Sequence, residues 1–448
     1  MFRDRLPDPR DEGRLAKDRG RLCRQVAQLA KGQDKEMRRH LFDLLEGRRT
    51  GEAGLPRVGL LPRVTGQEVV IAWGELLLRT DDAERSHAAA LLRRFHLVGE
   101  PVACLQGRLV RYVNKDLKPR QLDRLARELR SRGVAASVNH IAPLAPIVKG
   151  LGGPEPTRVR ADVVGPGATA AGGDRVTIAV IDTGITDKPR SDGWLDSVPR
   201  SADNLDPLDA IPTGGDGYLD FGAGHGTFAS GVVQQVAPES EIRVLRAVDS
   251  DGIGSEVEVA CALVDAVQGG ADIVNLSLGS NTADDLPPVA LSVALEIVAE
   301  WEEQHERRDD RTLLVAAAGN NGDSSPVWPA AFRRVVSVAG LTADLRPAGW
   351  SSRGFWVDCS AVGEGVVSTY VEGRESPELD VQPDAYGRDP WALWSGTSFA
   401  APQVVGAVAR LRQEGSPSVR DALRSVLRAG RPVPAFGQAV QILPGTGA

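Results

Sequence analysis

Cysteine is scarce in this sequence. Only four cysteines occur in 448 residues, and they lie far apart in the chain, at Cys23, Cys104, Cys261 and Cys359. Small domains that are held together by disulfides carry many closely spaced cysteines, and metal sites carry clustered ones. We therefore expect four reduced residues, with Cys261 in an apolar helix and Cys359 in an apolar strand, and neither a disulfide framework nor a cysteine metal site.

Long apolar runs and an excess of one charge are also missing. No run reaches the roughly 20 apolar residues that a membrane-spanning helix needs. Neither the charged N-terminus nor Arg48-Arg49 is followed by the apolar core of a signal sequence, so these features, taken at face value, predict a cytoplasmic protein with no membrane partner. A net charge of −7, from 53 basic and 60 acidic residues, gives no reason to expect nucleic acid as a partner.

One segment near the C-terminal end suits nucleophilic chemistry. Ser398 follows Gly396-Thr397 and precedes Phe399-Ala400, at the start of a helical pattern. Small neighbours let a substrate carbonyl approach the hydroxyl, and the free N–H groups of a helix start can stabilise an oxyanion. Taken alone, Ser398 could equally be a helix N-cap.

Two upstream segments supply the other groups that a nucleophilic serine needs. The apolar run Val176–Ile181 ends in Asp182, which indicates a buried parallel strand with a carboxylate at its C-terminal tip. His225 opens another helical stretch. A histidine can remove the serine proton, and a buried carboxylate fixes the tautomer of that histidine. The chain order Asp182, His225, Ser398 is the order found in subtilisin.

At these residues the sequence resembles the subtilisin-like serine peptidases (subtilases), over roughly residues 150–448. A further motif, Ala317-Ala318-Gly319-Asn320, follows an apolar strand. The resemblance implies that Asn320 donates a side-chain hydrogen bond to the oxyanion, a contact whose loss costs about 100- to 1,000-fold in turnover in this family. Singly, Asp182 could be a strand-end cap, His225 a surface histidine and Asn320 a turn former. Together and in this order, the motifs favour catalysis.

The resemblance also implies a substrate cleft between two segments. One wall, beside the residue before the scissile bond, would be Ser277, Leu278 and Gly279. The opposite strand would be Gly252, Ile253 and Gly254. An extended peptide would bind there through main-chain hydrogen bonds, which tolerate many residue types. An ordinary turn before a helix explains the second segment nearly as well.

No metal or other cofactor is expected. The segment Val232–Val236 is short where many secreted members of the family have a calcium-binding loop. Several aspartates precede His225, namely Asp203, Asp206, Asp209, Asp216 and Asp220. Calcium ligands must converge on one point, and scattered aspartates in a Gly/Pro-rich loop are more typical of solvated side chains. Phe228 stands where many members have a second histidine that is not the base.

The first 175 residues divide into three segments. Residues 1–54 are charged, with apolar residues at helical spacing, and fit a docked amphipathic helix or a mobile arm equally well. Residues 55–148 follow the order β-α-β-β-α-β of a ferredoxin-like module, with strands within 68–80, at 101–104, 108–113 and 135–141, and helices at 81–96 and 116–132. Residues 149–175 are rich in glycine and proline and indicate a linker.

Residues 176–448 alternate apolar strands with helices. Strands are expected at 243–248, 273–278, 313–317 and 335–339, and helices at 255–268, 288–301 and 398–412. This pattern predicts a doubly wound, mostly parallel α/β sheet that places ligands at the C-terminal ends of its strands. Asp182 falls at such an end.

The sequence therefore predicts a serine endopeptidase acting on peptides or proteins through an acyl-enzyme on Ser398, with a narrow processing protease for a dedicated partner as one alternative. A catalytically idle peptide-binding protein is another, which the intact motifs argue against. Because subtilase propeptides often have a compact α/β fold, the resemblance implies that the module at 55–148 is an intramolecular inhibitor with its tail in the cleft. A permanent regulatory domain is the competing interpretation.

Overall fold

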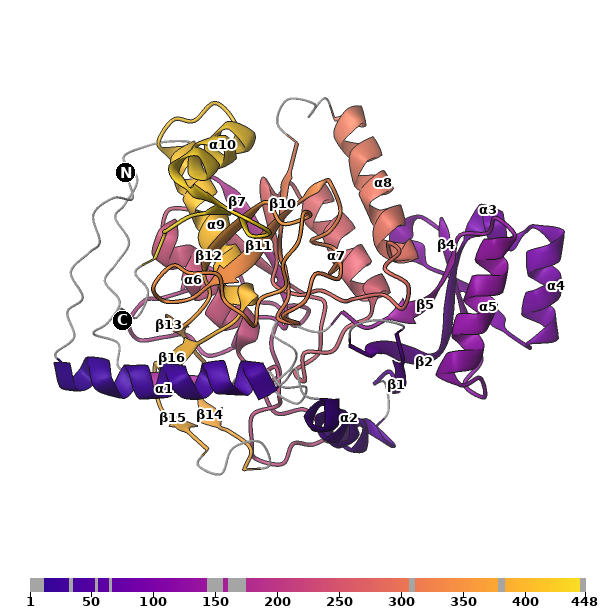
Figure 1. The fold of residues 1–448 in the computed structure, drawn as a ribbon, viewed down its shortest axis with the longest axis horizontal. Coiled ribbons are helices and arrows are strands. Elements are labelled where there is room, and N and C mark those ends of the chain that lie inside the picture. The colour runs from indigo at the N-terminus through magenta and orange to yellow at the C-terminus, as the bar shows by residue number, and fades with distance from the viewer. Residues whose placement is uncertain are drawn as a thin grey trace.

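A computed structural model describes residues 12–31, 35–52, 55–63, 67–142, 156–159, 175–305, 311–377 and 383–443 of the chain. An α/β body forms one end of the molecule and a smaller sheet with helices forms the other (Figure 1). Within the described ranges, no helix is both long and apolar enough to cross a bilayer. The predicted tail beyond Ala142 and most of the predicted linker lie outside the described residues.

The α/β body is built on an eight-stranded sheet with the order β17-β18-β12-β11-β10-β9-β7-β8. All neighbours from β8 to β18 are parallel, and β17 closes one edge as an antiparallel hairpin. The strands are β7 (Thr177–Asp182), β8 (Glu241–Arg246), β9 (Ile273–Leu276), β10 (Leu313–Ala317), β11 (Val335–Leu341), β12 (Cys359–Val362), β17 (Arg431–Val433) and β18 (Gly437–Ala439). The predicted parallel α/β sheet is thus confirmed.

Helices cover both faces of this sheet, which is why its central strands are continuous apolar runs. Ile178 and Val180 of β7 face the helices α6 (His225–Val236), α9 (Thr397–Gln413) and α10 (Val419–Ala429). The alternate residues Ala179 and Ile181 face α7 (Glu256–Gln268) and α8 (Val289–Gln304). The helices expected at 255–268, 288–301 and 398–412 correspond to α7, α8 and α9.

Two small antiparallel sheets flank the body. One has the order β13-β16-β6 and consists of β13 (Val366–Thr369), β16 (Trp391–Trp394) and β6 (Thr157–Val159). The other pairs β14 (Gly373–Arg374) with β15 (Ala385–Tyr386). Strand β6 lies within the segment that was predicted to be a linker. The local Gly/Pro composition could not reveal it, because β6 pairs with β16, more than 200 residues away.

The smaller unit contains β1 (Val58–Leu61), β2 (Val69–Arg79), β3 (Val98–Pro101), β4 (Leu109–Val113) and β5 (Ala136–His140). The long strand β2 pairs antiparallel with β1, β4 and β5, and β4 pairs with β3. Its helices are α3 (Thr80–Ala83), α4 (Ser86–Arg94) and α5 (Pro119–Ser131), with a 3-10 turn, η1 (Ala103–Leu105). We call residues 55–142 the N-terminal module.

Two local expectations for this module were wrong. The single helix expected at 81–96 is broken at Arg85, whose extended backbone starts α4 while its side chain contacts Asp82 and the Gly133 carbonyl. The strand expected at 101–104 lies earlier, at β3, and Ala103–Leu105 forms the 3-10 turn. Both shifts follow from contacts within the folded module that the apolar pattern does not contain.

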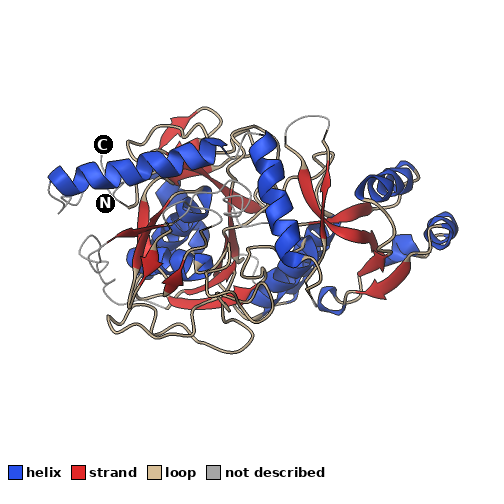
Figure 2. Cartoon of the chain, turned by 90° about the horizontal axis from the view of Figure 1, so that it is seen from below, coloured by secondary structure: helices blue, strands red, loops and turns tan. Residues whose placement is uncertain are grey.

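The described part of residues 1–54 is docked and helical. Helix α1 (Glu12–Lys31) and helix α2 (Lys35–Arg49) both lie against the α/β body, on the side that faces the viewer in Figure 2. Leu29 of α1 and Leu45 of α2 are buried. The sequence left open a docked helix or a mobile arm, and these residues form docked helices. We call residues 12–49 the arm.

The N-terminal module is joined to the α/β body by a disulfide. Cys104 of η1 pairs with Cys261 of α7, across 157 residues of sequence. The prediction of four reduced cysteines was therefore wrong for two of them, while Cys23 and Cys359 are free. The two partners meet only because the module packs on α7 and α8, and their separation in the sequence gave no sign of it.

Ion pairs reinforce the same interface. Arg108 donates two hydrogen bonds of 2.7 Å to the carboxylate of Glu300 on α8, and Arg79 pairs with Glu296 on the same helix. The fully buried Glu256 at the start of α7 accepts from the His140 backbone N–H over 3.2 Å. The module therefore contacts the body through both covalent and polar bonds.

Candidate active site

Asp182 and His225 form a direct pair at the C-terminal edge of the sheet. Asp182 is the last residue of β7 and His225 is the first residue of α6. The His225 Nδ1 atom lies 2.7 Å from Asp182 Oδ1 and 2.9 Å from Oδ2. A carboxylate in this position holds the proton on Nδ1 and leaves Nε2 as the basic nitrogen. Nε2 is buried and has no hydrogen-bond partner among the described residues.

Glycines allow α6 to approach β7 this closely. Gly224 has a φ of +80°, and a Cβ there would come within 2.7 Å of the Tyr370 ring. A Cβ at Gly226 would come within 2.2 Å of the Gly184 carbonyl oxygen. Side chains at either position would therefore push His225 away from Asp182.

Ser398 lies in the first turn of α9, next to the histidine. The ring of Phe399, the following residue, packs against the His225 ring with centroids 5.1 Å apart. The Ser398 hydroxyl donates to the Ser277 carbonyl over 3.0 Å, and Ser277 Oγ donates back to the Ser398 carbonyl over 2.7 Å. The hydroxyl thus points to Ser277, the residue that follows β9.

Asn320 contacts the residue before the serine. Its Oδ1 accepts from both the backbone N–H and the hydroxyl of Thr397, each over 3.0 Å. These two bonds fix the amide so that Nδ2 points elsewhere, and Nδ2 is buried without a hydrogen-bond partner among the described residues. A buried donor that is left unpaired costs free energy, so its presence beside a serine hydroxyl is typical of a site that binds a developing negative charge.

Aromatic side chains form the wall behind the histidine. Phe228 stacks on Phe399 with ring centroids 4.5 Å apart and meets Trp394 edge-on at 5.6 Å. Trp394 in turn contacts the His225 ring edge-on at 5.4 Å. The phenylalanine at 228 therefore belongs to an apolar cluster that excludes water from one side of the imidazole.

Asp206 is buried, although the sequence predicts a solvated side chain. Its Oδ2 accepts from Thr183 Oγ1 and from the Gly224 N–H, each over 2.8 Å, so it links the residue after Asp182 to the residue before His225. Burial raises the pKa of Asp206 to about 7. Asp206 and Asp220 are both buried, which contradicts the expectation that the aspartates before His225 are solvated. Only the surrounding fold could have shown this, because the loop sequence is Gly/Pro-rich.

The described residues contain no group of three or more His, Cys, Asp and Glu arranged to hold a metal ion. Both Asp206 Oδ2 contacts are to protein donors, Thr183 Oγ1 and the Gly224 N–H.

The two predicted cleft segments contact different parts of the chain, Gly254 the end of the N-terminal module and Ser277 the serine Ser398. The Ala142 N–H donates to the Gly254 carbonyl over 2.7 Å, and Ile141 forms an antiparallel bridge with Ser255. Ile253 packs against Ile141 and Phe221. A Cβ at Gly254 would lie 2.3 Å from the Ala247 carbonyl oxygen, so this strand leaves no space for a side chain there. The backbone of Gly254 and Ser255 therefore pairs with Ile141 and Ala142, while Gly252 and Ile253 form a turn with Asp249.

Ser277 contacts Ser398 directly, but its two neighbours serve packing. The Leu278 side chain is fully buried in the core cluster with α7 and α8, so only its backbone could meet a substrate. A Cβ at Gly279 would lie 2.8 Å from a methyl group of Val327. Gly252 lies against Gly222, where a Cβ would come within 2.6 Å of the Gly252 nitrogen.

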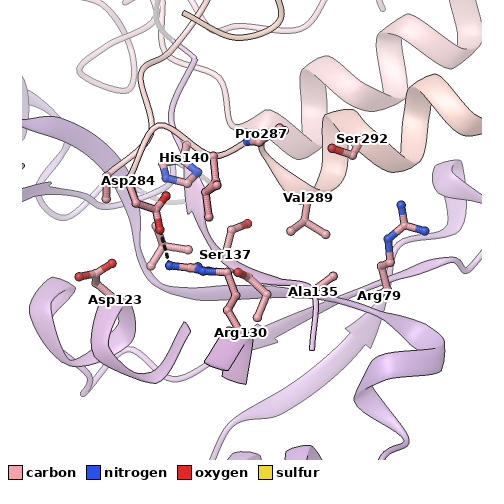
Figure 3. A pocket seen from close by; sticks show the side chains of 14 residues that line it. Arg79, Asp123, Arg130, Ala135, Ser137, His140, Asp284, Pro287, Val289 and Ser292 are labelled. Atoms are coloured by element: carbon pink, nitrogen blue, oxygen red, sulfur yellow. Dashed lines mark hydrogen bonds and ion pairs between the residues drawn. The ribbon is translucent and has the colours of Figure 1, made fainter. Parts of the chain in front are cut away.

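The candidate catalytic residues are closed to solvent. The exposed fraction is 0% for Ser398, 1% for His225 and 3% for Asn320. A separate cavity of about 300 Å³ lies where the module meets the loop before α8 (Figure 3). Arg130, which pairs with Asp284, lines it together with His140 and Val289, and no residue of the Asp182–His225–Ser398 set does so. This cavity belongs to the module interface.

Comparisons with known proteins agree with this geometry. The sequence model of the subtilase family matches residues 173–428. The chain is 32% identical over 240 residues to a thermophilic serine proteinase of Bacillus sp. (strain AK1), covering 53% of this chain and 52% of that protein. It is 28% identical over 256 residues to thermitase of Thermoactinomyces vulgaris, covering 55% and 77%. The chain thus spans about half the length of the first of these relatives.

Two solved structures share the fold. One is fervidolysin from Fervidobacterium pennivorans, a keratinolytic enzyme related to subtilisin, with a TM-score of 0.54, 18% identity and coverage of 86% of this chain and 64% of that one. The other is the epidermin leader peptide processing serine protease from Staphylococcus aureus, with a TM-score of 0.51, 16% identity and coverage of 83% and 97%. At these identities the likeness concerns the fold alone. Because the family match covers more than half of the chain, this protein belongs to the subtilase family of serine peptidases.

Proposed function

We propose that the chain is a serine endopeptidase in which Ser398 is the nucleophile and His225 the general base. Asp182 orients His225, and Asn320 Nδ2 donates to the oxyanion. The observation that carries this proposal is the Asp182–His225 contact of 2.7 Å, which leaves His225 Nε2 unpaired next to the serine turn. The unpaired Asn320 Nδ2 supports the same assignment from the other side of Ser398.

The reaction follows from these positions. The Ser398 hydroxyl turns from the Ser277 carbonyl to His225 Nε2, gives up its proton and attacks the scissile carbonyl carbon. The resulting oxyanion accepts a hydrogen bond from Asn320 Nδ2 while Asp182 stabilises the imidazolium. Collapse of this intermediate breaks the C–N bond, and His225 returns the proton to the leaving amine. A water molecule then hydrolyses the ester on Ser398 by the same steps, with His225 again as the base.

The substrate is an extended peptide or protein segment. The antiparallel contact of Ile141 and Ala142 with Ser255 and Gly254 supports strand addition at this edge, because a substrate could make the same main-chain bonds. Ser277, with its carbonyl already accepting a hydrogen bond from Ser398, would mark the opposite wall. The small residues of the walls indicate that backbone groups do most of the binding.

We further propose that residues 55–148 form a ferredoxin-like propeptide module that inhibits the enzyme intramolecularly. The chain order β2-α4-β3-β4-α5-β5 and the antiparallel pairings of β2 and β4 support the fold. The tail contact at Gly254 supports inhibition by a substrate-like strand. The boundaries at 54, 148 and 175 stay predictions.

The cytoplasmic location also stays a proposal. The Cys104–Cys261 pair weakens the cysteine argument for it, since disulfides persist mainly in oxidising compartments. A narrow processing role for a dedicated partner is the second candidate, and its support is limited to a shared fold with a leader-peptide processing protease.

Replacing Ser398 with alanine tests the function directly. The Ser398→Ala chain should neither react with a fluorophosphonate probe nor cleave a peptide library, and it should stay folded because the change removes one small hydroxyl. Ser425→Ala, on the exposed surface of α10, is the matched control and should behave like the parent. Intact mass measurement of both chains then reports whether cleavage within residues 142–172 needs Ser398. Undiminished peptide hydrolysis by Ser398→Ala would sink the proposed mechanism.

A further inference from the structure

The buried side chain of Gln25 anchors helix α1 beside the segment that leads into α9. Its Nε2 donates to the Leu393 carbonyl over 2.7 Å, and its Oε1 accepts from Ser395 Oγ over 2.7 Å. Both partners belong to the segment that ends β16 and leads into Ser398. Only 1% of Gln25 is exposed. An amide carries a donor and an acceptor at once, so it satisfies a carbonyl and a hydroxyl that a hydrocarbon side chain would leave unpaired.

Apolar contacts of α1 lie on the same side of the helix. Leu29 is buried with Ala348 and Trp350, and Val26 packs at the edge of this cluster. The spacing of Gln25, Val26 and Leu29 places all three on one helical face. Helix α1 runs past β16 in Figure 1, where Gln25 bonds to Leu393. Helix α1 thus contacts the strand that precedes Ser398.

Helix α2 covers the other end of the cleft with apolar side chains. Leu41, Phe42 and Leu45 of α2 pack in one cluster with residues of the body and of the N-terminal module. The body contributes Phe221 and Ile253, and the module contributes Val58, Ala72 and Ile141. Ile253 directly precedes Gly254, whose carbonyl accepts from Ala142, and Ile141 lies at the end of the module. Helix α2 therefore lies over both strands of this pairing.

Two consecutive arginines at the end of α2 enter a site built from carboxylates. Arg48 Nη2 lies 2.6 Å from Asp220 Oδ1 and 3.5 Å from Asp251 Oδ1, and its guanidinium lies 4.5 Å from the centre of the Phe221 ring. Arg49 Nη1 lies 2.7 Å from Asp249 Oδ2. The side chains of Asp220 and Asp251 are 0% exposed, and that of Arg49 is 1% exposed.

This carboxylate site is part of the cleft wall. Asp249 and Asp251 directly precede Gly252–Gly254, and Asp220 lies five residues before His225. Burial raises the pKa of both Asp220 and Asp251, and the nearby Arg48 opposes that shift. Without a cation, carboxylates this deeply buried would repel one another and lack a counter-charge. Arg48 and Arg49 therefore supply the positive charge that these buried carboxylates need.

We propose that the arm, residues 12–49, is a second inhibitory segment that holds the cleft closed through two anchors, Gln25 at β16 and Arg48–Arg49 at the carboxylate site. This proposal rests on the proposed function, since it presupposes a peptidase centre at Ser398. It differs from inhibition by the tail, because each anchor joins a residue of the arm to a residue of the body. Cleavage within residues 143–155 leaves every one of these contacts in place.

The test compares full-length chains by their rate of labelling with a small fluorophosphonate. Arg48→Met with Arg49→Met keeps the length of the side chains and removes their charge. Gln25→Leu breaks the other anchor and keeps its bulk. Arg39→Ala is the matched control, because Arg39 lies on α2 and its pair with Asp43 is exposed, at 60% and 55%. Removing one partner of a buried charge pair costs enough to raise the open fraction by about 30-fold or more.

The double arginine variant should therefore react with the probe at least about 30-fold faster than the parent. Gln25→Leu leaves neutral partners unpaired and should react about 5-fold faster or more. Arg39→Ala should stay within about twofold of the parent. If the double arginine variant fails to fold, as judged by its melting curve, Gln25→Leu decides alone. Equal labelling rates for the parent and Gln25→Leu, or no labelling of any anchor variant, would overturn the arm proposal. Labelling that persists when Ser398→Ala is added to an anchor variant would instead refute the proposed function.

Discussion

The N-terminal module should detach from the body far more easily when Cys104 is replaced with serine. The Cys104–Cys261 bond joins residues 157 positions apart, and the chain-entropy relation gives about 5 kcal/mol for closing a loop of this length. Native disulfides typically contribute about 2 to 5 kcal/mol when they are removed. We therefore expect the free energy of opening the module interface to fall by about 2 to 5 kcal/mol in Cys104→Ser.

Amide hydrogen exchange is the appropriate assay, because it reports local opening of one part of a chain that has several cores. The measurement uses the Ser398→Ala background so that self-cleavage cannot interfere. Exchange in β2 and β5 should accelerate in Cys104→Ser, while β9 and β10, in the core of the body, should change little. Cys23→Ser is the matched control, since Cys23 is exposed and unpaired.

A denaturing gel without reductant gives an independent readout. Once the linker of the active chain is cut, the N-terminal fragment should run with the body in the parent and in Cys23→Ser, and separately in Cys104→Ser. Unchanged exchange in β2 and β5 of Cys104→Ser would refute the stabilising role of the bond. A fragment that separates from the body in the oxidised parent would refute the bond itself.

Two further predictions concern the catalytic centre. Asn320→Ala should lower turnover by roughly 100-fold or more while Ser398 still reacts with a fluorophosphonate, because the oxyanion contact is lost together with the two bonds that Asn320 Oδ1 accepts from Thr397; parent-like kinetics of peptide hydrolysis would contradict this role. Asp206 has a folded-state pKa of about 7, above its ordinary value, so its contribution to stability is complete at acid pH and is lost as the pH rises towards and through 7. In denaturant unfolding, the free energy of unfolding of the parent should exceed that of Asp206→Asn most near pH 4, and this advantage should be lost by pH 8. A difference that does not change with pH would be the contrary result.

Much of the catalytic core could be predicted because its signals are local. The apolar run before Asp182 marks a buried strand whatever the rest of the chain does, and its last residue must lie at the edge of a parallel sheet. His225 and Ser398 both stand at the start of helices, and the structure places them at α6 and α9. The motifs and the family resemblance were sufficient to predict that Asp182 and His225 meet.

The contacts that we propose to control access to this core could not be predicted, because each joins residues far apart in the sequence. Gln25 is one polar residue in a charged helix, and nothing near it indicates that it bonds to Leu393, 368 residues away. Asp206 looks like any loop aspartate until Thr183 and Gly224 supply its hydrogen bonds. Arg48-Arg49 could be examined as part of a signal sequence, but only the fold shows their carboxylate partners.

These long-range contacts have a common consequence for how the enzyme could become active. On one side of residues 143–155, Ile141 and Ala142 are held on the body at Ser255 and Gly254, beneath α2. On the other side, β6 is paired with β16, and the Pro156 carbonyl accepts from Tyr386 over 2.7 Å. A cut between these points would create two ends that both remain bound to the body. We therefore propose that peptide cleavage alone would not open the site, and that release of α2 with its arginine pair would have to follow before Ser277 and Gly254 could bind a new strand.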